Sequence, residues 1–421
     1  MATPKLGGQA SWYPYYAGYS EAFVRDALKN MAGETTDLHV LDPWNGSGTT
    51  TSVAFRAGFA KVSGFDVNPA LVVISRARNL DAAVNESLTP LALDILGHAK
   101  RRMKSPSSLS SPSRLIDGWF DEQTAAWIRG VRRATQLLLS KSGPTKSGAR
   151  VAVEDITPLG AFFLVALFQV VRAATSSLRT SNPTWIKSTP PSPIAADPSQ
   201  LSKEYLAAVT ALAARLQAKG SRANPSVTLD VGSSDRLPLD AHSVDLVVTS
   251  PPYLTRIDYA IATLPELAVL EWAGDEVASL RKAMLGSPLT SAVDDTVVSL
   301  RSASASRLLG FVKGHKSVAS GTYYHRFYQS YFRQLEAGLA EVTRVAKPSS
   351  RMAIVVQDSY YKELRVALPE IVCETASSLG WQVDIRESFG SRTRASGHQW
   401  RRRYRTRSAA TEEAILLRRR T

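Results

Sequence analysis

The chain has 421 residues, of which 44% are hydrophobic, and its 51 basic residues outnumber its 37 acidic residues by 14. This apolar content is enough for a core, and the length corresponds to two or three domains of about 150 residues each. A single cysteine excludes a disulfide framework and cysteine-cluster metal sites. The six histidines show no ligand spacing, so we expect no structural metal.

The chain shows neither a secretory signal nor a membrane span. Residues 1–16 lack a basic stretch followed by an apolar one. The longest uncharged run, Ile156 to Val171, is shorter than the roughly 20 residues that a membrane helix needs, and it predicts a buried helix. We therefore expect a cytoplasmic protein without a membrane partner. The positive charge favours nucleic acid as the partner, and a merely solvated basic surface is the alternative.

The first part of the chain predicts a strand, a glycine turn, a helix, a strand and a second helix. The strand Leu38–Leu41 runs into the turn Asp42–Thr50, and a later strand, Val62–Phe65, ends at Asp66. Asn68 has a residue type that caps helices, and the proline after it suits the first helical position. A βαβα unit is therefore expected between residues 38 and 80.

The remaining chain predicts an inserted helical region and then further strands. We divide the whole chain into a cofactor-binding half at 1–100, a helical insertion at 101–225 and a catalytic half at 226–421. Gly286 to Thr322 has little periodicity, so we expect a long, mobile loop. The other expected elements are strands at Val227–Val231, Val244–Val248, Met352–Val356, Trp381–Ile385 and Ala414–Leu417, with a helix at Phe327–Val345. The last two strands suggest a terminal antiparallel hairpin on a mainly parallel sheet.

The glycine turn has the features of a nucleoside site. Gly46 and Gly48 allow backbone N–H groups to approach a ligand, and Asp66, twenty residues after Gly46, can accept the ribose hydroxyls. The turn lacks the three-glycine dinucleotide fingerprint and the lysine of a P-loop. A carboxylate at Asp42 suits an ammonium group rather than a phosphate. These features favour S-adenosylmethionine as the cofactor, and an ordinary tight turn is the alternative.

The turn Ser250-Pro251-Pro252-Tyr253 follows the strand Val244–Val248, where open α/β sheets carry their active sites. Its two prolines remove backbone donors and leave acceptors. The Ser250 hydroxyl oxygen and the Pro251 carbonyl could hold the two hydrogens of an exocyclic amine and aim its lone pair at a methyl group. Tyr253 offers a flat face to a flipped base. The alternative is a strand-terminating turn with a core tyrosine.

Together the two turns resemble those of the DNA amino-methyltransferases, which methylate exocyclic amines with S-adenosylmethionine. Asp42 to Thr50 matches the family's cofactor turn except at Trp44, and the segment Trp12 to Val24 is similar to the one that closes over the cofactor. The resemblance implies a Rossmann-like class I methyltransferase sheet. It also implies catalytic roles for Ser250, Pro251, Pro252 and Tyr253, and cofactor contacts for Tyr15, Asp42, Trp44, Gly46, Ser47, Gly48, Thr49, Asp66, Asn68 and Asp235.

The serine at position 250 resembles the cytosine-N4 members of this family, whereas aspartate or asparagine is usual for adenine-N6 members. We therefore favour cytosine N4, with adenine N6 as the alternative. Cytosine-C5 chemistry needs a thiolate, and Cys373 lies in an apolar helical stretch where we expect burial. An RNA guanine-N2 methyltransferase and a catalytically silent nucleic-acid-binding subunit are further alternatives. The family resemblance also implies a restriction-modification or phage-defence setting, with a nuclease or another defence protein as partner.

Two further features concern DNA. Residues 101–224 and 286–322 are candidate target-recognition regions, although Trp119, Trp127 and Trp185 are expected to be core aromatics rather than base wedges. From Trp381 to Thr421 there are eleven arginines against four acidic residues. Such density suits phosphate contact, and a solubilising loop is the alternative. The candidate DNA-binding residues are Arg256, Arg394, Arg401, Arg402, Arg403 and Arg405.

Overall fold

The computed structural model describes residues 12–13, 20–103, 114–142, 151–180, 186–187, 190–218, 225–255, 257–289, 299–390 and 411–420. The chain divides into two compact units. Unit 1 comprises Met1–Phe23, Asn45–Val231 and Asp258–Arg281, and unit 2 comprises Val24–Trp44, Gly232–Ile257 and Lys282–Thr421. The functional division at residues 1–100, 101–225 and 226–421 stays a prediction.

Seven strands form one mixed sheet in the order β3-β2-β1-β4-β5-β9-β8. Parallel pairs join β1 to β4, β2 to β3 and β4 to β5, and β9 runs antiparallel to both β5 and β8. This arrangement confirms the predicted α/β class, a mainly parallel sheet with a terminal antiparallel hairpin. The strands are β1 (His39–Asp42), β2 (Lys61–Asp66), β3 (Ser226–Val231), β4 (Val244–Thr249), β5 (Ala346–Gln357), β8 (Trp381–Gly390) and β9 (Thr411–Arg419); β6 (Ser359–Tyr361) and β7 (Leu364–Val366) pair separately.

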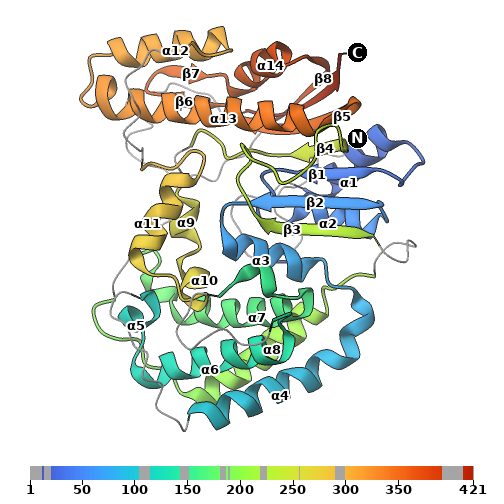
Figure 1. The fold of residues 1–421 in the computed structure, drawn as a ribbon. Coiled ribbons are helices and arrows are strands. Elements are labelled where there is room, and N and C mark those ends of the chain that lie inside the picture. The colour runs from blue at the N-terminus through green and yellow to red at the C-terminus, as the bar shows by residue number, and fades with distance from the viewer. Residues whose placement is uncertain are drawn as a thin grey trace. The chain divides into compact units, whose positions relative to one another are not determined.

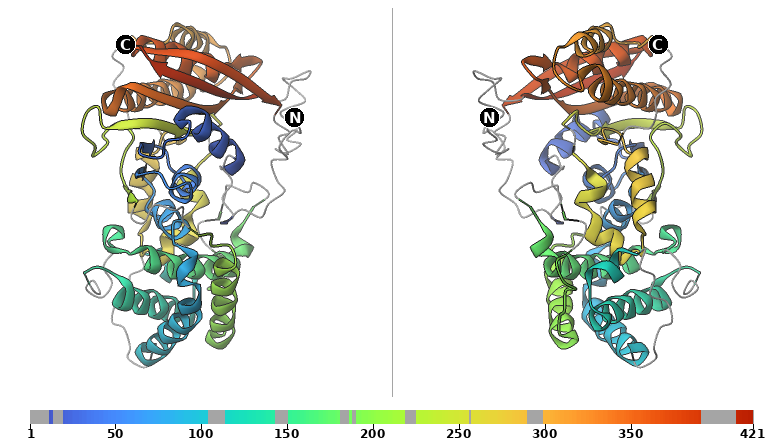
Figure 2. Two further views of the ribbon diagram at one scale, coloured as in Figure 1. Left: turned by 90° about the vertical axis from the view of Figure 1, so that its right-hand side faces the viewer. Right: turned by 90° about the vertical axis from the view of Figure 1, so that its left-hand side faces the viewer.

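Unit 1 contains β2, β3 and all of the described helices between residues 101 and 225. Helices α4, α6, α7 and α8 pack against one another, and α3 packs on α7 (Figure 1). The same helices, coloured blue to green, stay grouped in both side views (Figure 2). The helices of this unit are α2 (Thr49–Arg56), α3 (Pro69–Arg78), η1 (Ala82–Val84), α4 (Asn85–Met103), α5 (Leu115–Trp119), α6 (Glu122–Leu139), η2 (Val153–Asp155), α7 (Pro158–Ala174), η3 (Ser176–Leu178), α8 (Pro198–Ala213), α9 (Tyr259–Ala262), α10 (Leu264–Val269) and most of α11 (Gly274–Ala283).

Helix α7 confirms the buried helix expected from the uncharged run. The Thr157 hydroxyl caps it by accepting the N–H of Gly160 at 3.0 Å, and a proline follows at the first helical position. All seven residues from Phe162 to Phe168 are fully buried, so the helix forms the centre of this unit's core. Trp119 and Trp127 are also buried, as expected of core aromatics, and Trp185 lies outside the described residues.

Unit 2 contains the strands β1, β4, β5, β8 and β9. Among its helices, α12 packs against α13 and α14, and α14 packs on β8 (Figure 1). Phe327, Tyr331, Leu335, Leu339 and Val342 are buried along one face of α13, which confirms the periodicity of the predicted helix. The helices are most of α1 (Glu21–Ala32), α12 (Ala303–Gly314), the π-helical turn η4 (Ser320–Tyr324), α13 (His325–Val345) and α14 (Leu368–Ser378).

The expectation of a long loop from Gly286 to Thr322 was wrong for its second half, which forms α12 and begins η4. The Ser302 hydroxyl caps α12 by accepting the N–H of Ala305 at 3.0 Å. Ala305, Leu308 and Val312 are buried at helical spacing. Serine, alanine and glycine surround this short apolar stripe and hide it in the sequence. Residues 290–298 lie outside the described part of the chain.

Within the described ranges, none of the helices is long and apolar enough to cross a membrane. The same ranges contain no group of three or more histidine, cysteine, aspartate or glutamate residues that could hold a metal ion.

Candidate functional site

The two predicted turns begin side by side in unit 2. Strands β1 and β4 are parallel neighbours, with Leu41 opposite Val247, so their carboxyl ends lie at the same edge of the sheet. Asp42 ends β1, and its Oδ1 accepts the Thr249 hydroxyl at 2.6 Å and the Trp44 N–H at 3.1 Å. Thr249 directly precedes Ser250. This hydrogen bond therefore joins the start of the turn Asp42–Thr50 to the start of the Ser-Pro-Pro-Tyr turn.

Asp42 itself is 1% exposed. From the sequence, this carboxylate is expected to face the ammonium group of a ligand. In the structure, Oδ1 of Asp42 accepts hydrogen bonds from Thr249 and Trp44, at the starts of the two neighbouring turns. Burial with hydrogen-bond donors is how proteins keep a carboxylate in the interior. The contact with a ligand stays a prediction.

Trp44, the residue that departs from the family pattern, is accommodated by a glycine on α13. A Cβ added at Gly338 would lie 2.6 Å from Cζ2 of the Trp44 indole and 3.1 Å from the Ser234 hydroxyl oxygen. The first distance is shorter than real side chains show, and the second is tighter than most real contacts. Any larger residue at position 338 would therefore displace the indole. The large side chain at position 44 packs against a glycine, which has no side chain, at position 338. This pairing was not visible in the sequence, because the two positions are far apart in the chain.

In unit 1, Asp66 holds the glycine turn. Its Oδ2 accepts the Gly46 N–H at 2.9 Å and its Oδ1 accepts the Asn68 N–H at 2.8 Å. The Phe65 carbonyl accepts the neighbouring Asn45 N–H at 3.0 Å. These hydrogen bonds therefore join the turn to the end of β2. Asp66 lies at the strand end beside the glycines, as expected from the sequence.

Gly48 sits in the left-handed region, with φ of +81°, at the start of α2. A Cβ there would lie only 2.9 Å from Cβ of Ser75 on α3. Ser75 also accepts the Asn45 side-chain amide at 2.7 Å, and Asn45 in turn accepts the Thr51 hydroxyl at 2.9 Å. Asn45, Thr51 and Ser75 thus support the turn. These three residues were not predicted from the sequence, although an asparagine next to a glycine turn is a signal of side-chain hydrogen bonding.

Three other predicted cofactor residues in unit 1 have partners within the protein. Arg78 of α3 donates to the Ser47 carbonyl at 3.4 Å and to the Thr49 hydroxyl at 3.1 Å. Asn68 is fully buried; its side-chain oxygen caps α3 at the Ala70 N–H, as predicted, and its amide donates to the Thr263 hydroxyl at 2.8 Å. Asn68 therefore has a structural role whatever it contributes to a ligand.

In the Ser-Pro-Pro-Tyr turn, the hydroxyl groups contact neighbouring strands. The Ser250 hydroxyl lies 3.0 Å from the Val355 carbonyl of β5 and 3.3 Å from the Tyr253 hydroxyl oxygen. The Tyr253 hydroxyl donates to Oε1 of Glu412, at the start of β9, at 2.6 Å. The Pro252 carbonyl accepts the Tyr331 hydroxyl at 2.7 Å. Neither Glu412 nor Tyr331 was predicted as a site residue from the sequence. For Glu412, the acidic residues that follow the arginine-rich segment were the available signal.

The remaining predicted site residues are dispersed or outside the described part of the chain. Asp235 lies in unit 2, exposed, four residues beyond β3. The residues outside the described ranges are Tyr15, Arg256, Arg394, Arg401, Arg402, Arg403 and Arg405. Their roles in cofactor and DNA contact stay predictions.

Cys373 is buried in α14, as the sequence analysis expects. Burial raises the pKa of its thiol to about 11, because a thiolate would lose its hydration. The thiol is therefore neutral near pH 7. This state does not suit a nucleophile that must attack a cytosine ring.

A buried charged cluster in unit 1 contains Tyr13. The Tyr13 hydroxyl donates to Glu266 of α10, whose Oε1 also accepts Nε of Arg172 at 2.6 Å. Burial, reinforced by the Glu266 carboxylate, raises the pKa of Tyr13 well above its ordinary value. The hydroxyl therefore stays protonated and can act as a donor. Tyr13 belongs to the segment 12–24 that the sequence analysis associates with the cofactor.

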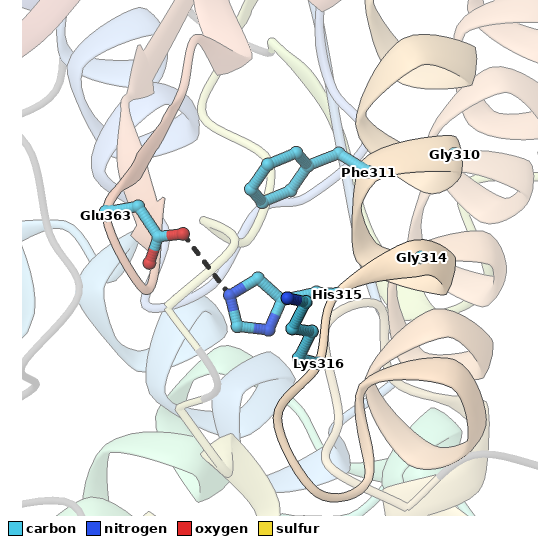
Figure 3. A pocket seen from close by; sticks show the side chains of 6 residues that line it. All are labelled: Gly310, Phe311, Gly314, His315, Lys316 and Glu363. Atoms are coloured by element: carbon cyan, nitrogen blue, oxygen red, sulfur yellow. Dashed lines mark hydrogen bonds and ion pairs between the residues drawn. The ribbon is translucent and has the colours of Figure 1, made fainter.

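A pocket elsewhere in unit 2 contains none of the predicted site residues. It lies where α12 meets the β6–β7 turn and is lined by Gly310, Phe311, Gly314, His315, Lys316 and Glu363 (Figure 3). Glu363 points toward His315, with its Oε1 at 3.2 Å from Nε2. Because these residues take no part in the two turns, we assign them no role in the site.

No family model matches the chain, and no curated protein matches it. Among solved structures, it is similar to a protein of Thermus thermophilus that is provisionally named a DNA modification methylase and was crystallised with S-adenosyl-L-methionine. That match has 17% identity, covers 44% of this chain and 48% of that one, and has a TM-score of 0.22. The chain thus spans about half the length of that protein. A second match, to the cyclase SpnF, has 10% identity, covers 95% of this chain and 82% of that one, and has a TM-score of 0.34. Both scores are low, so the fold assignment rests on strand order and pairing.

Proposed function

We propose that the protein is an S-adenosylmethionine-dependent DNA methyltransferase that methylates the exocyclic amine of a flipped base, namely N4 of cytosine. The observation that carries the proposal is the hydrogen bond between Thr249 and Asp42. It ties the cofactor turn to the Ser-Pro-Pro-Tyr turn at adjoining strand ends. Direct transfer requires that a methyl donor and an amine be held close together, and the joined starts of the two turns in unit 2 support this requirement.

The residues present fit this cofactor. Gly48, in the left-handed conformation, packs against Ser75 at a place where a larger residue would clash. The carboxylate of Asp66 lies beside the turn and accepts the Gly46 N–H. A carboxylate at a strand end suits ribose hydroxyls. S-adenosylmethionine supplies, when bound, a methyl group on a sulfonium, whose S–C bond breaks as the new N–C bond forms. The chain's own residues hold and orient the reactants.

The catalytic turn provides acceptors for the amine. The proton of the Ser250 hydroxyl has an acceptor in the Val355 carbonyl at 3.0 Å, which leaves the serine lone pairs available. The Pro252 carbonyl already accepts a hydrogen bond from the Tyr331 hydroxyl, so the Pro251 carbonyl is the second acceptor in our proposal. Holding both amine hydrogens favours a tetrahedral nitrogen with its lone pair exposed for attack. The amine proton released by transfer leaves to solvent.

The choice of cytosine N4 rests on the serine at position 250, and the choice of DNA rests on the family resemblance and the arginine-rich segment after β8. In the proposal, Arg256, Arg394, Arg401, Arg402, Arg403 and Arg405 contact phosphates. Such contacts position a duplex without reading its sequence. A restriction-modification or phage-defence setting, with a nuclease partner, would follow from this activity.

The proposal is tested with Ser250→Ala and Tyr253→Ala in single-turnover methylation, with calorimetry on the same samples. Ser250→Ala removes an acceptor but keeps the aromatic face, so transfer should slow while DNA binding survives. Tyr253→Ala removes a stacking face worth roughly 1–3 kcal/mol per base, so base capture should weaken as well. Both variants should bind S-adenosylmethionine like the wild type. A wild-type transfer rate in Ser250→Ala would mean that another residue orients the amine.

A further inference from the structure

The Tyr253 hydroxyl is engaged by a carboxylate that lies outside the Ser-Pro-Pro-Tyr turn. It donates to Oε1 of Glu412 at 2.6 Å, and the Ser250 hydroxyl oxygen lies 3.3 Å from the same tyrosine oxygen. A hydrogen bond to a charged acceptor is about twice as strong as one between neutral groups. The phenol proton is therefore directed at Glu412 and away from Ser250.

Glu412 is well placed to hold this direction, because its backbone is fixed on both sides. Strand β9 lies between β5 and β8, where Glu412 pairs with Gln357 and Phe389. The residue before it, Thr411, donates its N–H to Oδ1 of Asp358 at 2.7 Å, and its carbonyl accepts the Asp358 N–H at 3.1 Å. Arg365 donates to the other Asp358 oxygen at 2.6 Å.

The neighbouring Glu413 has a different environment. It is 7% exposed, and its Oε2 accepts two nitrogens of Arg386, which also pairs with Glu370. Successive residues of a strand point to opposite faces of the sheet. The two glutamates can therefore be compared directly: Glu412 accepts the Tyr253 hydroxyl, and Glu413 forms an ion pair with Arg386.

We infer that Glu412 is a positioning residue for methyl transfer, acting through Tyr253. The inference rests on the proposed function. By accepting the phenol proton, Glu412 keeps the tyrosine ring in one orientation and keeps both hydroxyl oxygens of the turn as acceptors. Without the carboxylate, the phenol proton can turn to Ser250 or to the amine nitrogen of the base. Donation to that nitrogen would occupy the lone pair that must attack the methyl group.

A double-mutant cycle between positions 412 and 253 tests this role in the full-length protein. We expect Glu412→Ala to slow single-turnover methyl transfer by about 10- to 100-fold, the range for a hydrogen bond to a charged group. The affinity for S-adenosylmethionine should stay unchanged. Glu412→Gln, whose amide oxygen can still accept the phenol proton, should recover most of the rate.

The decisive comparison is made with Tyr253→Phe, which keeps the aromatic face but has no phenol proton to misdirect. In that background, Glu412→Ala should cause no further loss of rate, whereas a purely structural role in β9 would cause the same loss in both backgrounds. Glu413→Ala serves as the matched control; we expect it to lower the melting temperature and to leave the transfer rate close to that of the wild type.

Equal losses in the two backgrounds, or a wild-type rate in Glu412→Ala, would overturn the inference while leaving the proposed function intact. A wild-type protein that binds S-adenosylmethionine but methylates no DNA would contradict the proposed function instead, and the inference would then fall with it.

Discussion

Replacing Gly48 with alanine perturbs the backbone turn that is expected to hold the cofactor. Gly48 has φ of +81°, where an L-residue pays a penalty because Cβ approaches the following carbonyl. In addition, the new methyl group would lie 2.9 Å from Cβ of Ser75 and 3.0 Å from its Cα, and α3 is buried along almost its whole length. The neighbour cannot move without shifting the helix.

The magnitude follows from these two effects. The left-handed conformation costs about 1–2 kcal/mol for alanine, and overpacking a buried contact costs about 1–3 kcal/mol. Gly48→Ala should therefore destabilise the protein by about 2–5 kcal/mol. Gly380→Ala is a matched control, because Gly380 has φ of +87° and nothing within 4 Å of its added Cβ. Gly380→Ala should therefore destabilise the protein only by the cost of the left-handed conformation.

Urea unfolding of both variants, with calorimetric titration of S-adenosylmethionine, measures the two consequences. The difference in stability between the variants reports the clash. Cofactor affinity should fall by about tenfold or more in Gly48→Ala alone, as expected if one strong hydrogen bond from the turn is lost. If Gly48→Ala were as mild as Gly380→Ala and bound the cofactor normally, the turn would not be the cofactor site that we propose.

Three further predictions address the second strand, the arginine-rich segment and the cysteine. Asp66→Ala should weaken S-adenosylmethionine binding by roughly 1.5–3 kcal/mol; unchanged calorimetric affinity would contradict the assignment of Asp66 to the ribose. Neutralising Arg401, Arg402 and Arg403 together should lower DNA affinity on all sequences and flatten its salt dependence by up to ~2.7 log units per log of salt; a loss confined to one sequence would indicate base reading instead. Because burial raises the pKa of Cys373 to about 11, its alkylation in the native protein should be slow at pH 8 and accelerate only as the pH approaches that value, whereas fast alkylation at pH 8 would show an exposed thiolate.

Most of the sheet could be predicted from the sequence because its strands are short, apolar and bounded by turn residues. Val244–Thr249 illustrates this. The antiparallel pairing of β8 with β9 was expected from the lack of a helix between these two strands. Helix α12 was missed because its buried face consists of Ala305, Leu308 and Val312 in a segment that otherwise has the composition of a loop.

Side-chain contacts between distant segments could not be predicted in the same way. Glu412 follows Tyr253 by 159 positions, and only the pairing of β9 with β5 brings it to the turn. Gly338 likewise reads as an ordinary residue of a helix until the indole of Trp44 is found against it. Such contacts depend on the register of the sheet and the rotation of a helix, and neither is encoded in a local pattern.

The most direct test of the account is the identity of the nucleoside that the protein modifies. DNA from cells that express the wild-type protein, and from cells that express Ser250→Ala, would be digested to nucleosides and analysed by mass spectrometry alongside total RNA. The account predicts N4-methylcytosine in DNA with the wild-type protein and much less with the variant. N6-methyladenine in DNA would contradict the choice of base, and methylguanine confined to RNA, or no new methylated nucleoside at all, would contradict the proposed activity.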